Sequence, residues 1–85
     1  MKEPTVSHQM SPLELYNKGL EFISNERYDD GIKCWKEAAR LYAEMGDTER
    51  AKACLNMLSS VYQNLGYMEE AIETHQKTYE ISPHA

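Results

Sequence analysis

Residues 15–32 read LYNKGLEFISNERYDDGI, and residues 55–72 repeat the pattern as LNMLSSVYQNLGYMEEAI. Leucine, a small residue and an aromatic residue return at matching places, and the acidic pair at 29–30 is answered by one at 69–70. Self-similarity at an interval of about 20–50 residues marks stacked supersecondary units. The interval of forty residues therefore predicts a repeat fold, whose surfaces serve binding more often than catalysis.

Size and charge exclude several classes of protein. The 85 residues suffice for one small domain, and a hydrophobic content of 41% suits a globular chain. With 14 acidic against 9 basic residues and no cluster of Lys or Arg, the chain lacks the basic face that nucleic acids and anionic membranes require. It also contains no long apolar run and no leader peptide near Met1. We therefore expect a cytoplasmic protein with no nucleic-acid partner and no membrane insertion.

The two cysteines, Cys34 and Cys54, do not form a CxxC pair and are too few for a disulfide framework. We expect both to be reduced and semi-buried. A Cys34–Cys54 bridge between helices stays open as an alternative, because the sequence does not give the distance between them.

The helical part of the chain begins at residue 11. Residues 1–10 lack periodicity and contain Pro4, which predicts a flexible N-terminal tail. Ser11 can then cap a helix, Pro12 suits its first position and Glu14 completes a capping box. The spacing of apolar residues predicts four helices, at about residues 12–25, 28–45, 48–64 and 68–81.

The ends of these helices are marked by glycine and proline. Gly46 and Gly66 are natural C-terminal stops, Pro83 disfavours helix in the residue before it, and Asp47 or Thr48 can cap the third helix. Short connections make neighbouring helices antiparallel. We predict an all-α fold of two antiparallel helix hairpins, as one domain at 11–85 with repeat 1 at 11–46 and repeat 2 at 47–83.

Small and bulky residues alternate where the helices must touch, which favours close packing. The small ones are Gly19, Gly31, Ala38, Ser59 and Ala71. The bulky ones are Phe22, Trp35 and Tyr62.

This pattern resembles the tetratricopeptide repeat (TPR). The matching residues of the first unit are Leu15, Gly19, Phe22, Tyr28, Gly31, Trp35 and Ala38. Those of the second are Leu55, Leu58, Tyr62, Gly66, Ala71, Ile72 and Pro83. Ser59, Gly31 and Thr78 depart from the family pattern, but each is small. The resemblance implies that the hairpins stack as a right-handed superhelix.

The interval of forty residues is longer than the usual repeat of about 34 residues. The extra residues fall at 41–46. This longer variety is similar to the repeats of Pins-type polarity adaptors, rapsyn and kinesin light chains.

The resemblance implies a non-enzymatic protein–protein interaction module, a scaffold or adaptor that binds a peptide on the concave surface made by the first helix of each hairpin. The residues expected to face this groove are Tyr16, Asn17, Leu20, Ser24, Asn56, Ser60, Gln63 and Asn64. Amide side chains there can donate to and accept from a peptide backbone at once. In the alternative interpretation these residues form a solvated face, with Tyr16 and Leu20 packed against the tail. The cationic clamp with which some family members hold a terminal carboxylate is absent, since Tyr16, Leu20, Asn56 and Met57 stand at the matching positions.

The apolar stripe of the last helix predicts an uncovered face, because repeat arrays normally need about three units and a polar cap. Its residues are Met68, Ile72, His75 and Tyr79. We interpret His75 itself as a semi-buried packing residue. The second functional hypothesis is therefore a structural or self-associating piece, either a homodimer or a fragment of a longer helical scaffold.

No motif supports catalysis or a metal site. The chain has no HxxxH, HExxH or CxxC pattern. Cys34 and His75 lack a third residue to orient them. The acidic pairs at 29–30 and 69–70 are better explained as complements to helix N-termini. We expect no cofactor, no metal and no enzymatic activity.

Overall fold

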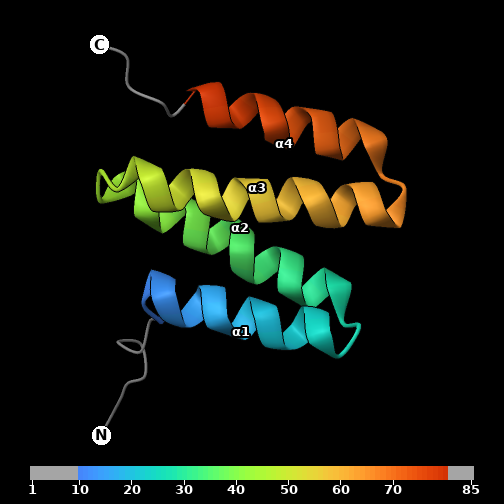
Figure 1. The fold of residues 1–85 in the computed structure, drawn as a ribbon. Helices are drawn as coiled ribbons and strands as arrows, with labels where there is room; N and C mark the ends of the chain where they lie inside the picture. The colour runs from blue at the N-terminus through green and yellow to red at the C-terminus, as the bar shows by residue number, and fades with distance from the viewer. Residues whose placement is uncertain (1–9, 81–85) are drawn as a thin grey trace, which may run out of the picture.

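The computed structural model describes residues 10–80, which form four helices: α1 (Pro12–Ser24), α2 (Tyr28–Glu44), α3 (Thr48–Leu65) and α4 (Met68–Glu80). These residues contain no strand. Each helix packs on the one before it in the chain, so α1 and α4 lie on opposite sides of the stack (Figure 1). The predicted all-α fold of stacked helical hairpins is confirmed. The tail expected at 1–10 lies outside the described residues, apart from Met10, as does the helix end expected at 81–83.

The predicted caps form at the starts of α1 and α3. Ser11 Oγ accepts a hydrogen bond from the backbone N–H of Glu14 at 3.1 Å, and the Glu14 carboxylate accepts one from the Ser11 N–H at 2.8 Å. This is the reciprocal capping box that the sequence predicts. Of the two candidates at the start of α3, Asp47 is the cap, because its carboxylate accepts from the Arg50 N–H at 3.2 Å.

The three connections between helices share one geometry. Glu26, Gly46 and Gly66 each have a positive φ, of 63°, 82° and 86°. The N–H of the following residue donates to the carbonyl of Phe22, Tyr42 or Tyr62, at 2.8, 2.9 and 2.8 Å. This pattern closes a helix on a left-handed residue, a place that favours glycine. The two glycine stops were predicted, whereas the left-handed Glu26 was not.

Trp35 forms the centre of the packing between α1 and α2. Its side chain is 1% exposed, and its indole Nε1–H donates to the carbonyl oxygen of Tyr16 at 3.0 Å. The indole also stacks on the Tyr16 ring, with 6.1 Å between the ring centroids. A Cβ at residue 19 would overlap the indole, so only glycine leaves room for this approach. The predicted burial of Trp35 against a small residue is confirmed.

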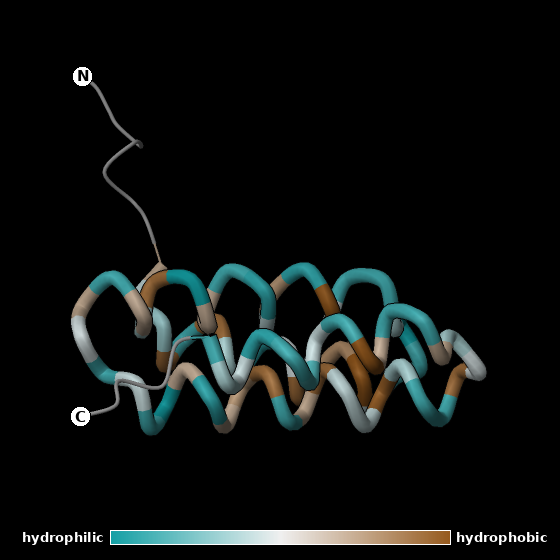
Figure 2. Tube along the Cα trace, turned by 90° about the horizontal axis from the view of Figure 1, so that it is seen from above, coloured by the Kyte–Doolittle hydropathy of each residue, from teal (hydrophilic) through white to brown (hydrophobic). Residues whose placement is uncertain are grey.

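The core continues through α3 to α4. The buried apolar residues beyond Trp35 are Ile32, Ala38, Ala39, Tyr42, Ala51, Cys54, Leu55, Leu58, Val61, Tyr62 and Ala71. Two buried hydroxyls donate to backbone carbonyls: Ser59 to that of Ala71 at 3.2 Å, and Thr78 to that of His75 at 2.6 Å. Figure 2 shows hydrophilic positions along much of the outer turns and hydrophobic ones between the helices.

The prediction that His75 is semi-buried is wrong. His75 stands where the first unit has Trp35, but its side chain is exposed. Ser59 occupies the position of Gly19, and no described helix follows α4 to cover this face. The His75 ring instead lies edge-on against Tyr79, with 5.6 Å between the ring centroids.

Replacing Gly19 with alanine should destabilise the domain by about 1–3 kcal/mol. Overpacking of this size exceeds the helix propensity that alanine gains over glycine, which is about 1 kcal/mol. Thermal unfolding followed by circular dichroism measures the effect, with Glu21→Ala on the exposed face of α1 as the control. A Gly19→Ala variant as stable as the wild type would contradict the close approach.

Replacing Glu26 with glycine should stabilise the domain by about 0.5–1 kcal/mol, since a side chain in the left-handed region is strained. Urea unfolding measures the difference in unfolding free energy. Glu21→Gly, in the interior of α1, is the matched control and should lower stability instead. A loss of stability in Glu26→Gly would exclude the left-handed turn.

Candidate functional site

A small cavity lies between α1, α2 and α3. It has a volume of about 160 Å³ and is lined by Leu13, Tyr16, Tyr42, Arg50, Ala53 and Cys54. Leu13 and Tyr16 come from α1, and Ala53 and Cys54 from α3, so the cavity spans the first helix of each hairpin. We call it the A-helix groove. Apart from Arg50 its lining is apolar or aromatic, and its size suits one side chain of a bound peptide.

The eight residues predicted to face the groove are not all brought together. Tyr16 lines the cavity, half-buried on the face of Trp35. Six others are exposed on α1 and α3 without lining it: Asn17, Leu20, Ser24, Asn56, Ser60 and Asn64. Gln63 lines a different cavity, at the α4 end of the stack.

Five residues that line the groove were missed: Leu13, Ala53, Tyr42, Arg50 and Cys54. A signal for the first two was present, because Leu13 and Ala53 stand forty residues apart, one turn before the equivalent pair Tyr16 and Asn56. No periodicity places Tyr42 or Arg50 at the groove, since they belong to different helices.

A second candidate surface is the outer face of α4, which we call the terminal face. A cavity of about 360 Å³ there is lined by Ser59, Gln63, Met68, Ala71, Ile72, His75 and Gln76. Of the predicted self-association residues, Met68, Ile72 and His75 line this cavity, and Tyr79 lies against His75. The structure thus places these four side chains on one uncovered surface.

Burial and one ion pair shift the pKa values of groups around the A-helix groove. Burial raises the pKa of the Cys54 thiol to about 11, and it also raises the pKa of Tyr42. Arg50 donates to the Asp47 carboxylate at 2.8 Å, which lowers the pKa of Asp47. Both thiols are free, so the alternative of a Cys34–Cys54 bridge does not form in this structure. Neutral Cys54 and Tyr42 leave the groove without a reactive nucleophile at physiological pH.

Over residues 10–80, no group of three His, Cys, Asp or Glu side chains could hold a metal ion. None of the helices α1 to α4 combines the length and the apolarity needed to cross a bilayer.

A family model described as tetratricopeptide repeat matches the chain at residues 32–56 and 54–84. The second range covers most of the hairpin made by α3 and α4, and the first runs from α2 into α3. No curated protein and no solved structure matches the chain.

Cys34 should react with iodoacetamide at pH 8 at least about tenfold faster than Cys54. Burial raises the pKa of both thiols, but Cys54 is almost fully buried, whereas Cys34 is half-buried. Only the thiolate attacks, so the higher pKa and the burial act in the same direction. Mass spectrometry of peptides taken over time gives both rates, and the two rates should converge in 8 M urea, which serves as the control. Equal rates in the folded protein would contradict the burial of Cys54.

Proposed function

The chain belongs to the tetratricopeptide repeat family, and on that premise we propose that it is a non-enzymatic adaptor that holds a peptide segment of a protein partner in the A-helix groove. The observation that carries the proposal is the cavity between α1 and α3, which lies beside an exposed row of amide and hydroxyl side chains. Members of this family mediate protein–protein interactions, and this cavity is lined by residues from the first helix of each hairpin.

The groove offers two kinds of contact to an extended peptide. Leu13 and Tyr16 form an apolar wall that can receive one hydrophobic side chain. Asn56 and Ser60 are exposed on α3, one turn apart, and can donate to and accept from peptide backbone groups. A hydrophobic anchor flanked by backbone hydrogen bonds fits a peptide better than a small molecule, because the cavity of about 160 Å³ is smaller than usual ligand sites.

Within the family we place the chain among the long repeats that resemble those of Pins-type polarity adaptors, rapsyn and kinesin light chains. Support comes from the left-handed residues of the turns. Those inside the two hairpins fall at 26 and 66, forty residues apart, and the one between the hairpins falls at 46. We keep the units at 11–46 and 47–83 and propose a cytoplasmic location.

The double variant Leu20→Glu with Asn56→Ala should weaken partner binding by at least about tenfold while leaving the melting temperature unchanged, because both side chains are exposed. A partner is first isolated by affinity capture and mass spectrometry, and its shortest binding peptide is then titrated by fluorescence anisotropy.

Two variants sharpen this experiment. Ala53→Gln places a longer side chain in the cavity and should block the hydrophobic anchor. Glu73→Gln, on the exposed surface of α4, is the control and should bind as the wild type does. Unchanged affinity both in Ala53→Gln and in the double variant Leu20→Glu with Asn56→Ala would exclude the A-helix groove as the binding site.

A second candidate function is self-association through the terminal face. The observation that favours it is the contrast between equivalent residues: Ile32, covered by the second hairpin, is 8% exposed, whereas Ile72 is 57% exposed. Tyr79 is 71% exposed on the same helix. Apolar side chains at positions that stacking buries elsewhere in the same chain favour a homodimer or a place in a longer scaffold.

Tyr79→Glu together with Ile72→Glu should dissociate such a dimer, since burying two carboxylates at its centre is costly. Sedimentation equilibrium over a hundredfold range of concentration measures the mass. Glu73→Lys, on the same helix, keeps the apolar residues and serves as the control. A wild-type protein that stays monomeric throughout would exclude this second function.

A further inference from the structure

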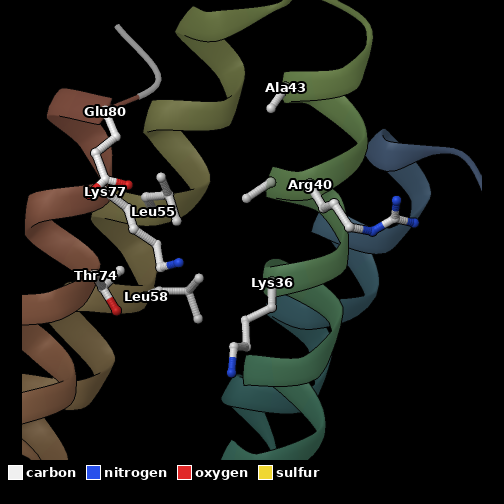
Figure 3. Close-up of a pocket in the computed structure, with 9 residues that line it drawn as sticks. Lys36, Arg40, Ala43, Leu55, Leu58, Thr74, Lys77 and Glu80 are labelled. Carbon is white, nitrogen blue, oxygen red and sulfur yellow. The ribbon is translucent and has the colours of Figure 1, made fainter.

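A trough on the opposite side of α3 joins the second helices of the two hairpins. It has a volume of about 290 Å³ and lies between α2 and α4, with Leu55 and Leu58 of α3 at its floor (Figure 3). Ala43 and Thr74 form its walls. We call it the B-helix trough. It shares no lining residue with the A-helix groove or with the terminal face.

Two lysines from different helices stand over this apolar floor. Lys36 of α2 and Lys77 of α4 both extend into the space between the two helices (Figure 3). Both are exposed, and neither forms an ion pair with a carboxylate among residues 10–80. The chain carries a net charge of −5, so two unpaired ammonium groups over leucines are a local exception to its acidity.

The third cation at the trough is already neutralised. Arg40 pairs with Glu37 and Glu44 on its own helix, and its guanidinium points away from Leu55 and Leu58 (Figure 3). Only the aliphatic part of Arg40 therefore faces the trough. Glu80 also lines the trough, one turn after Lys77 on α4 (Figure 3). The trough thus has an apolar floor, two ammonium groups over it and one carboxylate at the C-terminal end of α4.

We propose that the B-helix trough binds an acidic amphipathic peptide of a partner protein, with apolar side chains on Leu55 and Leu58 and carboxylates paired to Lys36 and Lys77. Charge complementarity favours this occupant, because the carboxylates of an acidic segment can pair with both ammonium groups. The trough runs from Lys36 to Ala43, seven residues of α2 or about 10 Å, which matches two turns of a bound helix. This surface lies apart from the A-helix groove, so the proposal stands or falls independently of the function proposed above.

The test uses a pair of synthetic peptides. Both are fluorescein-labelled helices of twelve residues with leucine at positions 4, 7 and 8; one carries glutamate on both flanks of the leucines, and the other carries glutamine there. The acidic peptide should bind the full chain at least about tenfold more tightly at 50 mM NaCl, and most of this advantage should vanish at 500 mM NaCl, because salt screens exposed charge pairs. Fluorescence anisotropy measures both affinities.

Charge-reversal variants assign the site. Lys36→Glu with Lys77→Glu should weaken binding of the acidic peptide by at least about tenfold, whereas the matched control Lys18→Glu with Lys33→Glu makes the same change in net charge and should stay within about threefold of the wild type. Glu80→Gln should strengthen binding about twofold, since it removes a like charge from the end of the trough. Circular dichroism should show unchanged helicity in all three, because the substituted side chains are exposed.

Changes in the amide chemical shifts of the protein, measured by NMR as the acidic peptide is added, show where the peptide binds. Shifts concentrated on α2 and α4 around Lys36 and Lys77, and retained in the groove variant Leu20→Glu with Asn56→Ala, support the proposal. Shifts on α1 instead, equal weakening by the two charge-reversal pairs, or no binding at 1 mM peptide overturn it.

Two other occupants would also overturn the proposal. Tighter peptide binding by more than tenfold after deletion of residues 81–85 would assign the trough to that segment. A dimer that dissociates in the Lys36→Glu and Lys77→Glu variant would assign it to a second copy of the chain.

Discussion

The approach of the α1 backbone to the indole of Trp35 is the constraint on which the rest of the stack depends. A buried indole needs a partner for its N–H, and the Tyr16 carbonyl supplies it at 3.0 Å only because Gly19 has no side chain. This contact fixes how α1 lies on α2. It therefore also fixes the Tyr16 ring at the mouth of the A-helix groove.

The second hairpin keeps the helices of the first but not this contact. Ser59 replaces Gly19, and its hydroxyl bonds to the Ala71 carbonyl, so α3 and α4 are joined by a small polar contact in place of a large aromatic one. His75, the counterpart of Trp35, is left exposed. The difference explains why one end of the stack is well packed and the other presents an open apolar face around Ile72.

Predictions that rest on neighbours within about one helical turn succeeded. The capping box at Ser11, the glycine stops at 46 and 66 and the four helices were all readable, because caps and apolar stripes involve residues three or four positions apart. The left-handed backbone of Glu26 was not predicted, because no glycine stands at that position to indicate it. The burial assigned to His75 was wrong because the stripe of α4 shows which side is apolar but not whether another helix covers it.

By itself the sequence determined the all-α class, the helix ends from residue 12 to residue 68 and the pairing of hairpins, since these follow from local periodicity and turn chemistry. Only the tertiary structure decided which side chains meet. The A-helix groove joins Tyr42 to residues of α1 and α3, and the B-helix trough joins Lys36 to Lys77, forty-one residues further along the chain. These arrangements of side chains from different helices depend on how three helices pack against one another, and no pattern within a single helix encodes that packing.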